Sequence, residues 1–510
     1  MDAFRRRAAV LLLAAILALG MLAAPAQAAT PLAGRRPNIV LVMPDDQGYG
    51  DLGCHGNPIL KTPSVDAFYK DCVRFTDFHV SPTCAPTRSA LMTGRHEFKN
   101  GITHTILERE RLTLKATTTA QVLKSAGYTT GIFGKWHLGD EVAYQPERRG
   151  FDEVFIHGAG GIGQTYPGSG GDAPGNKYFD PAIKHNGKFE KTKGYCTDVF
   201  FAQAVKWMDT ARKSGKPFFT YITPNAPHGP LDCPPAYEAK YAGKVAPNVA
   251  KFYGMIENMD DNFGRLLAKL KEWGVERDTL VIFMTDNGGT AGVQTFNAGM
   301  RGAKGTPYMG GTRVPALWRW PAGFAGGRDV DKLTAHIDII RTFAELSGAK
   351  LSDDAQRQAE GRSLVPLLSN ANAEWADRVL FTHVGRWDKG KAAESKYATV
   401  SARNTRYHLV NAVRQGERWE LFDVKADPGC KTSIADEKPE VVRELKSAID
   451  RWWIELTPLL VNEDAVGPKL NPFKEQFWKQ FGGGPSEDDL KQMDPNRKFG
   501  EGGAKAKKKQ

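Results

Sequence analysis

The sequence predicts an α/β fold, in which helices cover both faces of a parallel sheet, followed by a smaller C-terminal α+β subdomain. Short, nearly continuous apolar runs, typical of strands buried on both faces, alternate with segments of helical periodicity. This alternation persists to about Asn370, and beyond it strand-like runs precede a single helix. Hydrophobic residues make up 41% and charged residues 25% of the 510 positions, a globular composition that excludes wholesale disorder and fibrous structure.

Four strands of the main sheet are predicted from these apolar runs. They cover residues 38–43, 127–133, 217–222 and 279–284. Between the last two, apolar residues recur at helical spacing from Ile256 to Trp273, and Gly274 is expected to end that helix. Thr197 is predicted to be the N-cap of a further helix that precedes the third strand.

The change of pattern near Asn370 separates a main domain, residues 35–370, from a subdomain at residues 371–465. In the subdomain, strand-like runs precede one helix: the runs are residues 379–383, 407–410 and 419–424, and the helix is 439–453. From about Val466, a glycine run and a lysine-rich end predict a poorly ordered basic tail, residues 466–510.

Residues 1–28 have the organisation of a secretory signal peptide. Three arginines at residues 5–7 precede an apolar run from Ala8 to Ala24, and the tripeptide at residues 26–28 provides a small-residue cleavage site. The apolar run barely reaches the length that spans a bilayer, so cleavage is expected rather than a retained anchor or stable membrane insertion. The expected location is the periplasm or the medium, by an export route that the sequence leaves open.

The chain is basic, with a formal net charge of +11 to which the signal peptide and the lysine tail contribute. A basic surface suits anionic ligands such as sulfated or acidic polymers, phosphates or nucleic acid. No RNA- or DNA-binding module is recognisable in the sequence, so no nucleic-acid partner is predicted.

Polar side chains follow each of the four predicted strands. They are Asp45 and Asp46, Lys135 and His137, Asn225 and His228, and Asp286 and Asn287. Because ligands bind beyond the carboxyl ends of parallel strands, these groups are expected to gather at one edge. Aspartate and amide oxygens suit a hard cation such as Ca²⁺ or Mg²⁺ rather than zinc. A single aspartate pair after a strand is commonly turn or N-cap chemistry, but the second oxygen pair favours a metal site.

The segment from Ser81 to Arg95 combines a cysteine with a predicted helix. Pro86 fits the first turn of that helix and Gly94 fits its C-terminal cap. Cys84 therefore stands at a helix N-terminus, where free N–H groups and the helix dipole favour an anion, and Arg88 follows one turn later. A lone cysteine in such a place is commonly a small buried hydrophobe, and the spacing to Arg88 is too short for the phosphate loop of a thiolate phosphatase.

The pattern Cys84-x-Pro86-x-Arg88, continued to Arg95, resembles the signature of the formylglycine-dependent sulfatases. Further blocks resemble that family in the same order: residues 45–51, 131–139, 285–288, 301–305 and 361–364. The resemblance covers roughly residues 35–435. It implies an alkaline-phosphatase-like fold, with a large mixed, mostly parallel sheet sandwiched by helices, and a sulfuric ester hydrolase of the arylsulfatase type.

The resemblance also implies a modified nucleophile. In such sulfatases a maturation enzyme oxidises the signature cysteine, here Cys84, to formylglycine (3-oxoalanine). One hydroxyl of the hydrated aldehyde attacks sulfur and expels the alcohol, and the other loses its proton so that sulfate can leave. A serine could form the sulfate ester but would lack the second hydroxyl.

Metal ligands and catalytic roles follow from the same resemblance. The implied metal ligands are Asp45, Asp46, the modified Cys84, Asp286 and Asn287, with Ca²⁺ expected and Mg²⁺ as the alternative. The implied catalytic residues are Arg88, which holds the hydrate, Lys135, which contacts sulfate, His137, which bonds the non-attacking hydroxyl, and His228 and Lys304, which face the leaving-group oxygen. The general acid remains open between the last two. Structural alternatives are a turn cap for His228, a surface position for Lys304 and an aspartate partner for Lys135.

The expected activity is hydrolysis of sulfate monoesters, aryl sulfates in vitro and carbohydrate sulfates in nature. One alternative is a phosphonate or phosphate ester hydrolase of the same superfamily, and another is an inactive relative that binds sulfated glycans. The complete set of catalytic side chains argues against an inactive binder.

Other cysteines and histidines are expected to be structural. Five cysteines remain once Cys84 is modified, and a disulfide between Cys196 and Cys233 is predicted. Four histidines are assigned to the structural group: His96, His104, His157 and His336.

Overall fold

A computed structural model describes residues 31–166 and 170–494. The predicted signal peptide, residues 1–28, and the lysine-rich end lie outside the described residues. From Ala33 onward the described chain forms one compact unit. No helix in the described ranges has both the length and the apolar composition that a membrane crossing requires.

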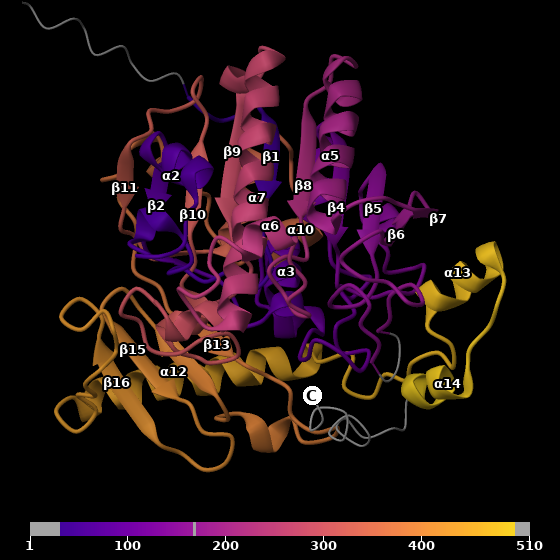
Figure 1. Cartoon of the computed structure of the whole chain (residues 1–510). Helices are drawn as coiled ribbons and strands as arrows, with labels where there is room; N and C mark the ends of the chain where they lie inside the picture. Colours follow the sequence, from indigo (N-terminus) through magenta and orange to yellow (C-terminus); the bar gives the residue numbers. More distant parts are fainter. Residues whose placement is uncertain (1–30, 167–169, 495–510) are drawn as a thin grey trace, which may run out of the picture. The chain divides into compact units, whose positions relative to one another are not determined.

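The largest element is a ten-stranded sheet with the order β11-β2-β10-β9-β1-β8-β4-β5-β6-β7 (Figure 1). Its five central strands run parallel: β9 (Thr279–Met284), β1 (Asn38–Val42), β8 (Phe218–Thr223), β4 (Thr129–Lys135) and β5 (Glu153–His157). The strands on either side are β10 (Ala316–Arg319), β2 (Val73–Phe75), β11 (Arg328–Val330), β6 (Ala182–His185) and β7 (Lys188–Lys191). Both β10 and β6 run antiparallel to their central neighbours. The predicted mixed, mostly parallel sheet is confirmed, and all four predicted strands belong to it.

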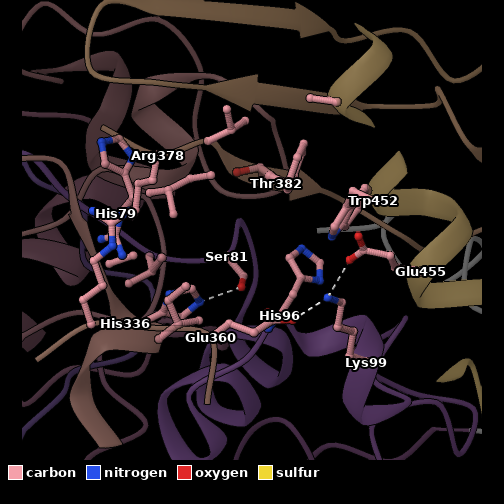
Figure 2. A pocket seen from close by; sticks show the side chains of 18 of the residues that line it. His79, Ser81, His96, Lys99, His336, Glu360, Arg378, Thr382, Trp452 and Glu455 are labelled. Carbon is pink, nitrogen blue, oxygen red and sulfur yellow. Dashed lines mark hydrogen bonds and ion pairs between the residues drawn. The ribbon is translucent and has the colours of Figure 1, made fainter. Parts of the chain in front are cut away.

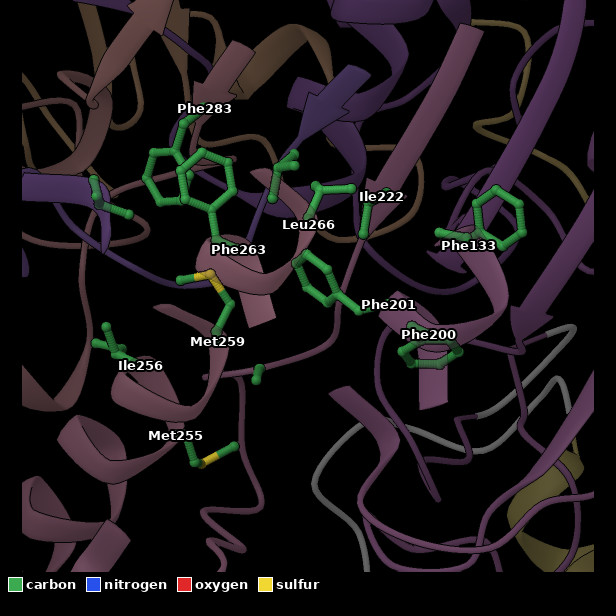
Figure 3. Close-up of a cluster of buried hydrophobic side chains, with 14 of the residues drawn as sticks. Phe133, Phe200, Phe201, Ile222, Met255, Ile256, Met259, Phe263, Leu266 and Phe283 are labelled. Carbon is green, nitrogen blue, oxygen red and sulfur yellow. The ribbon is translucent and has the colours of Figure 1, made fainter. Parts of the chain in front are cut away.

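Helices cover both faces of this sheet because side chains of successive strand residues point to opposite faces. On one face, α5 (Cys196–Arg212), α7 (Pro247–Glu272) and α2 (Pro63–Lys70) enclose the cluster in Figure 3, which includes Phe133, Ile222 and Phe283. On the other, Phe219 packs edge-on against Phe343 of α9 (Ile339–Ser347). Two further helices, α3 (Cys84–Thr93) and α4 (Thr119–Ser125), pack with α9.

One predicted helix cap needs correction, and one helix is longer than its apolar residues indicated. The helix α7 begins at Pro247, well before the apolar residues from Ile256, because proline is well suited to a first turn. The helix α5 begins at Cys196 with Tyr195 as its N-cap, so the assignment of Thr197 as the cap is wrong. Thr197 is instead buried inside the first turn.

The C-terminal part forms a separate antiparallel sheet of four strands. In spatial order they are β13 (Leu380–His383), β14 (Val400–Arg403), β15 (Tyr407–Asn411) and β16 (Trp419–Asp423). The helix α12 (Pro439–Leu456) shares a buried cluster with them that contains Trp452 and Trp453 and also Phe98, which follows α3. The prediction missed β14, a four-residue strand.

Two further predictions are wrong. Beyond Val466 the chain forms α13 (Pro472–Phe481) and α14 (Glu487–Met493), so the tail is not poorly ordered as far as Asp494. Phe473 is buried and packs edge-on against Phe189, whereas the sequence offered only a glycine run as a guide. The Cys196–Cys233 disulfide is also absent, since all six cysteines are free. Cys233 instead bonds the Pro234 carbonyl, and Cys196 is buried at the start of α5.

Candidate active site

The polar residues that follow the central strands meet at one end of the sheet, as contacts between their side chains show. Lys135, the last residue of β4, places Nζ 2.6 Å from Oδ2 of Asp45, which follows β1, and both side chains are fully buried. Asp286, which follows β9, accepts a hydrogen bond of 3.1 Å from the backbone N–H of Asp46. Asn287 donates from Nδ2 to Oδ1 of Asp46 at 3.0 Å.

Arg88 ties the helix α3 to this cluster. Its guanidinium lies 2.8 Å from Oδ2 of Asp286, and both side chains are buried. It also donates to the Lys135 carbonyl at 3.0 Å and to the Thr223 hydroxyl. One arginine therefore fixes the ends of three strands relative to the helix that carries Cys84.

Cys84 is the first residue of α3 and lines a large cavity at the site. Burial alone would raise the pKa of its thiol, but the charges of Lys135 and Lys304 hold that pKa below its ordinary value. Gly94 ends the helix with φ +72°, as predicted, and a Cβ there would lie 2.2 Å from the Ile340 side chain. Glycine is therefore required to set the length of α3.

Two buried oxygens test whether a cation fits this site. Oδ1 of Asp45 and Oδ1 of Asn287 have no hydrogen-bond partner among the described residues. Buried acceptors are rarely left unpaired, and leaving one so costs about 1–3 kcal/mol. Ligand atoms of Asp45, Asp46 and His228 also lie within 4.8 Å of one another. The oxygen-rich set fits a hard divalent cation.

The pKa values of the carboxyl groups in this cluster also favour a bound cation. Burial raises the pKa of Asp45 to about 6, and burial with the neighbouring charge of Asp45 raises that of Asp286 to about 6. Burial opposes ionisation of Asp46 as well, but Lys304 and His228 hold its pKa below the ordinary value. Three carboxylates share this buried site with Arg88, Lys135 and Lys304, and a divalent cation would add positive charge that favours the ionised forms of Asp45 and Asp286.

Each of the two histidines has one ring nitrogen bonded to a backbone carbonyl. Nε2 of His137 donates to the Thr105 carbonyl at 2.8 Å, and its buried Nδ1 has no partner in the described part of the chain. Nδ1 of His228 donates to the Gly229 carbonyl at 2.7 Å, and Nε2 faces Oδ2 of Asp46 at 3.9 Å. Burial lowers the pKa of both, which favours the neutral ring, in which the nitrogen that does not donate is an acceptor.

Lys304 lies at the same cluster, with Nζ 2.5 Å from Oδ1 of Asp46, and its side chain is mostly buried. The surface position considered from the sequence is therefore wrong. The pKa of Lys304 is raised by the charge of Asp46 in spite of burial. Lys135 does have an aspartate partner, Asp45. The same buried ammonium group would therefore make both this ion pair and the predicted contact with sulfate.

The cavity above Cys84 has a volume of about 1010 Å³. Cys84, His137, His228 and Lys304 line it, and so do residues that the sequence did not single out: Tyr166, Arg386, Trp387, Lys389 and Arg414. His104, predicted to be structural, also lines it. No motif marked these residues, because they come from loops that only the folded chain brings together.

A second cavity, of about 420 Å³, lies beside the C-terminal sheet (Figure 2). The Ser81 hydroxyl and Nε2 of His336 form a 2.9 Å hydrogen bond there, and Lys99 contacts Glu360 and Glu455. Its lining contains none of the predicted catalytic or metal-binding residues. His336 lines this second cavity and lies outside the predicted catalytic cluster.

Comparisons with known proteins identify the family of this chain. The family model described as Sulfatase matches residues 37–349, and the model described as N-sulphoglucosamine sulphohydrolase, C-terminal, matches residues 304–453. Arylsulfatase A of Bos taurus is 31% identical over 472 residues, covering 84% of this chain and 88% of that protein. N-acetylgalactosamine-6-sulfatase of Rattus norvegicus is 31% identical over 415 residues, covering 74% of this chain and 73% of that protein.

Solved structures share the fold. The crystal structure of Ps i-CgsB in complex with k-i-k-neocarrahexaose has a TM-score of 0.73 and 26% identity, covering 87% of this chain and 97% of that one. The phosphonate monoester hydrolase of Agrobacterium radiobacter has a TM-score of 0.58 and 21% identity, covering 84% and 96%. Because its identity to this chain is only 21%, the similarity to this hydrolase indicates a shared fold and nothing about activity.

Proposed function

The chain belongs to the sulfatase family and is a sulfuric ester hydrolase, and we propose that it is exported and desulfates carbohydrates with a formylglycine at position 84 and a divalent cation. The observation that carries this proposal is the placement of Cys84. Cys84 begins a helix and lines a large cavity. The charged groups of Arg88, Lys135 and Asp45 lie around it. Maturation of Cys84 requires a formylglycine-generating enzyme as a partner.

The cation is proposed to be Ca²⁺, with Mg²⁺ as the alternative, held by Asp45, Asp46, Asp286, Asn287 and the modified Cys84. When bound it would neutralise sulfate charge and lower the pKa of the attacking hydroxyl. The orphaned oxygens of Asp45 and Asn287 support these ligands. Ca²⁺ is preferred because its oxygen coordination is tolerant of irregular geometry.

The proposed roles of the side chains follow from their free atoms. A formylglycine hydrate would supply one hydroxyl to attack sulfur and one whose deprotonation releases sulfate. Nδ1 of His137 is available to accept that proton, because Nε2 is already bonded to Thr105. Arg88 orients the hydrate, and Lys135 adds positive charge for the sulfate oxygens.

The substrate is proposed to be a sulfated saccharide. A cavity of about 1010 Å³ reaches the upper end of the range for small-molecule sites, whereas an aryl sulfate would fill only part of it. A related structure at 26% identity holds neocarrahexaose, and a relative at 31% identity is an N-acetylgalactosamine-6-sulfatase. Export to the periplasm or the medium is proposed from the signal-peptide pattern of residues 1–28.

The proposal is tested by comparing kcat/KM for the 4-nitrophenyl esters of sulfate, phosphate and phenylphosphonate. We expect sulfate to be preferred by at least about 10²-fold, which corresponds to roughly 2.7 kcal/mol of transition-state discrimination. A preference for phosphate or phosphonate would refute the sulfatase assignment and support the alternative hydrolase.

Removing the general acid is expected to slow hydrolysis most for substrates with a poor leaving group. His228→Asn and Lys304→Met each remove one group that faces Asp46. Loss of the proton donor should cost about 10²–10⁴-fold on a sugar sulfate, whose alkoxide needs a proton, but much less on 4-nitrophenyl sulfate. Measuring kcat/KM for both substrates identifies the donor as the variant with the leaving-group-dependent loss. Equal losses on both substrates in both variants would show that neither residue donates the proton.

A further inference from the structure

One part of the active-site cavity carries three cations from the C-terminal sheet region: Arg386, Lys389 and Arg414. Within residues 31–166 and 170–494, none of the three lies within ion-pair distance of a carboxylate. By contrast, Arg109 in the same cavity contacts Glu463 at 3.1 Å, so that pair is already matched. Asp388 and Glu108 also line the cavity, but neither forms an ion pair with these three cations in that part of the chain.

Arg386 is connected to the reacting residues through one intervening residue. Thr105 accepts a hydrogen bond from His137 with its carbonyl, at 2.8 Å, and one from Arg386 with its hydroxyl, at 3.2 Å. The Nε of Arg386 is buried and has no partner among the described residues. The guanidinium has five N–H donors, so most of its hydrogen-bonding capacity is left for a ligand.

The backbone holds Arg386 in this place at a conformational cost. Its φ is +60°, in the left-handed region that non-glycine residues rarely adopt. The preceding Gly385 lies so close to Thr103 that a Cβ would meet its carbonyl oxygen at 2.2 Å. The N–H of Arg386 donates to the same carbonyl at 2.9 Å. Strained, well-packed positions of this kind concentrate at ligand-binding sites.

The surrounding potential is positive. His104 lines the same cavity, and burial together with the charges of Arg386, Arg109 and Arg414 lowers its pKa to about 2. The low pKa means that His104 adds no positive charge to that of the three arginines. This part of the cavity therefore favours an anion that approaches beside the reacting sulfate.

We propose that Arg386, assisted by Lys389 and Arg414, is a second anion subsite that binds a sulfate or carboxylate of the substrate other than the sulfate being removed. A guanidinium is suited to either oxyanion because its fork of donors can bind two oxygens at once. The substrate class is accordingly a polyanionic saccharide, with a second charged group near the scissile ester. This inference rests on the proposed function, because it concerns the same cavity.

Competition against 4-nitrophenyl sulfate hydrolysis tests the subsite. The probes are galactose 6-sulfate, galactose 2,6-disulfate, and a disaccharide of glucuronate and galactose 6-sulfate. The wild-type protein should bind at least one doubly anionic probe about 10- to 100-fold more tightly than the monosulfate, the gain expected of a charge-assisted contact. The disulfate and the glucuronate probes distinguish a sulfate from a carboxylate as the second anion.

Variants of Arg386 test whether this residue causes the gain in affinity for a doubly anionic probe. Arg386→Gln should remove most of it, and Arg386→Lys should keep part of it, because the charge remains without the fork. Arg443→Gln, at an exposed position of α12 outside the cavity, is the matched control and should keep the full ratio. Melting temperatures would identify any variant that fails to fold.

The subsite is refuted if all three probes inhibit equally, or if the gain survives Arg386→Gln. Failure of the proposed function is a separate outcome, seen as absence of wild-type turnover of 4-nitrophenyl sulfate. In that event, calorimetric titration with the same probes still measures the ratio of affinities and decides on the subsite.

Discussion

Replacing Cys84 with alanine is expected to lower kcat/KM for sulfate esters by at least about 10⁴-fold, because it removes the proposed nucleophile. The position lies at the start of α3 and faces the cavity, so alanine removes little beyond the thiol. Initial rates with 4-nitrophenyl sulfate would measure the loss. Cys233→Ser is the matched control, because Cys233 is another buried thiol but does not line the cavity.

Cys84→Ser sharpens this prediction. A serine hydroxyl is able to take up one sulfate group but lacks the second hydroxyl that releases it. At most one equivalent of nitrophenol per protein molecule is therefore expected, followed by no turnover. Sustained multiple turnover in either Cys84 variant would contradict the proposed nucleophile.

Removal of the proposed divalent cation is expected to abolish activity and to destabilise the fold. Without the cation, three buried carboxylates share one site in which Oδ1 of Asp45 has no partner among the described residues. Dialysis against a chelator should stop hydrolysis, and Ca²⁺ at 100 times its Kd should restore it. The same addition should stabilise the folded chain by about 2.7 kcal/mol, seen as a rise in melting temperature.

Asp45→Asn should weaken both effects of Ca²⁺, because the variant loses a charged ligand but keeps the size of the side chain. Asp260→Asn provides the control: Asp260 is also buried, but it accepts hydrogen bonds from Ser64 and Val65 at the start of α2. Its Ca²⁺-dependent shift in melting temperature should equal that of the wild type. The cation site is refuted if neither the melting temperature nor the activity of the wild-type protein changes on addition of chelator or Ca²⁺.

The sequence predicted the central sheet because its strands are buried on both faces and therefore consist of nearly continuous apolar residues. The end of each run also located the polar residues, such as Asp45 and Asp286, that the structure brings together. The helix from Cys84 to Thr93 was predictable from Pro86 and Gly94, which have strong positional preferences at the two ends of a helix. Their functional roles stay predictions.

What the sequence did not predict depends on contacts between distant segments. The strand β14 is short, and α13 is held by Phe473, whose partner Phe189 lies far away in the chain. The wall residue Arg386 belongs to no motif, and its importance appears only through Thr105, which also contacts His137. Local patterns cannot indicate such pairings, because they arise from tertiary packing.

The most direct measurement relates turnover to the oxidation state of Cys84. Protein prepared with and without a formylglycine-generating enzyme would be digested, and mass spectrometry of the peptide containing Cys84 would give the aldehyde fraction. We predict that kcat per protein molecule rises in proportion to that fraction and approaches zero where the thiol is intact. Equal turnover in preparations with and without the aldehyde would contradict the proposed mechanism.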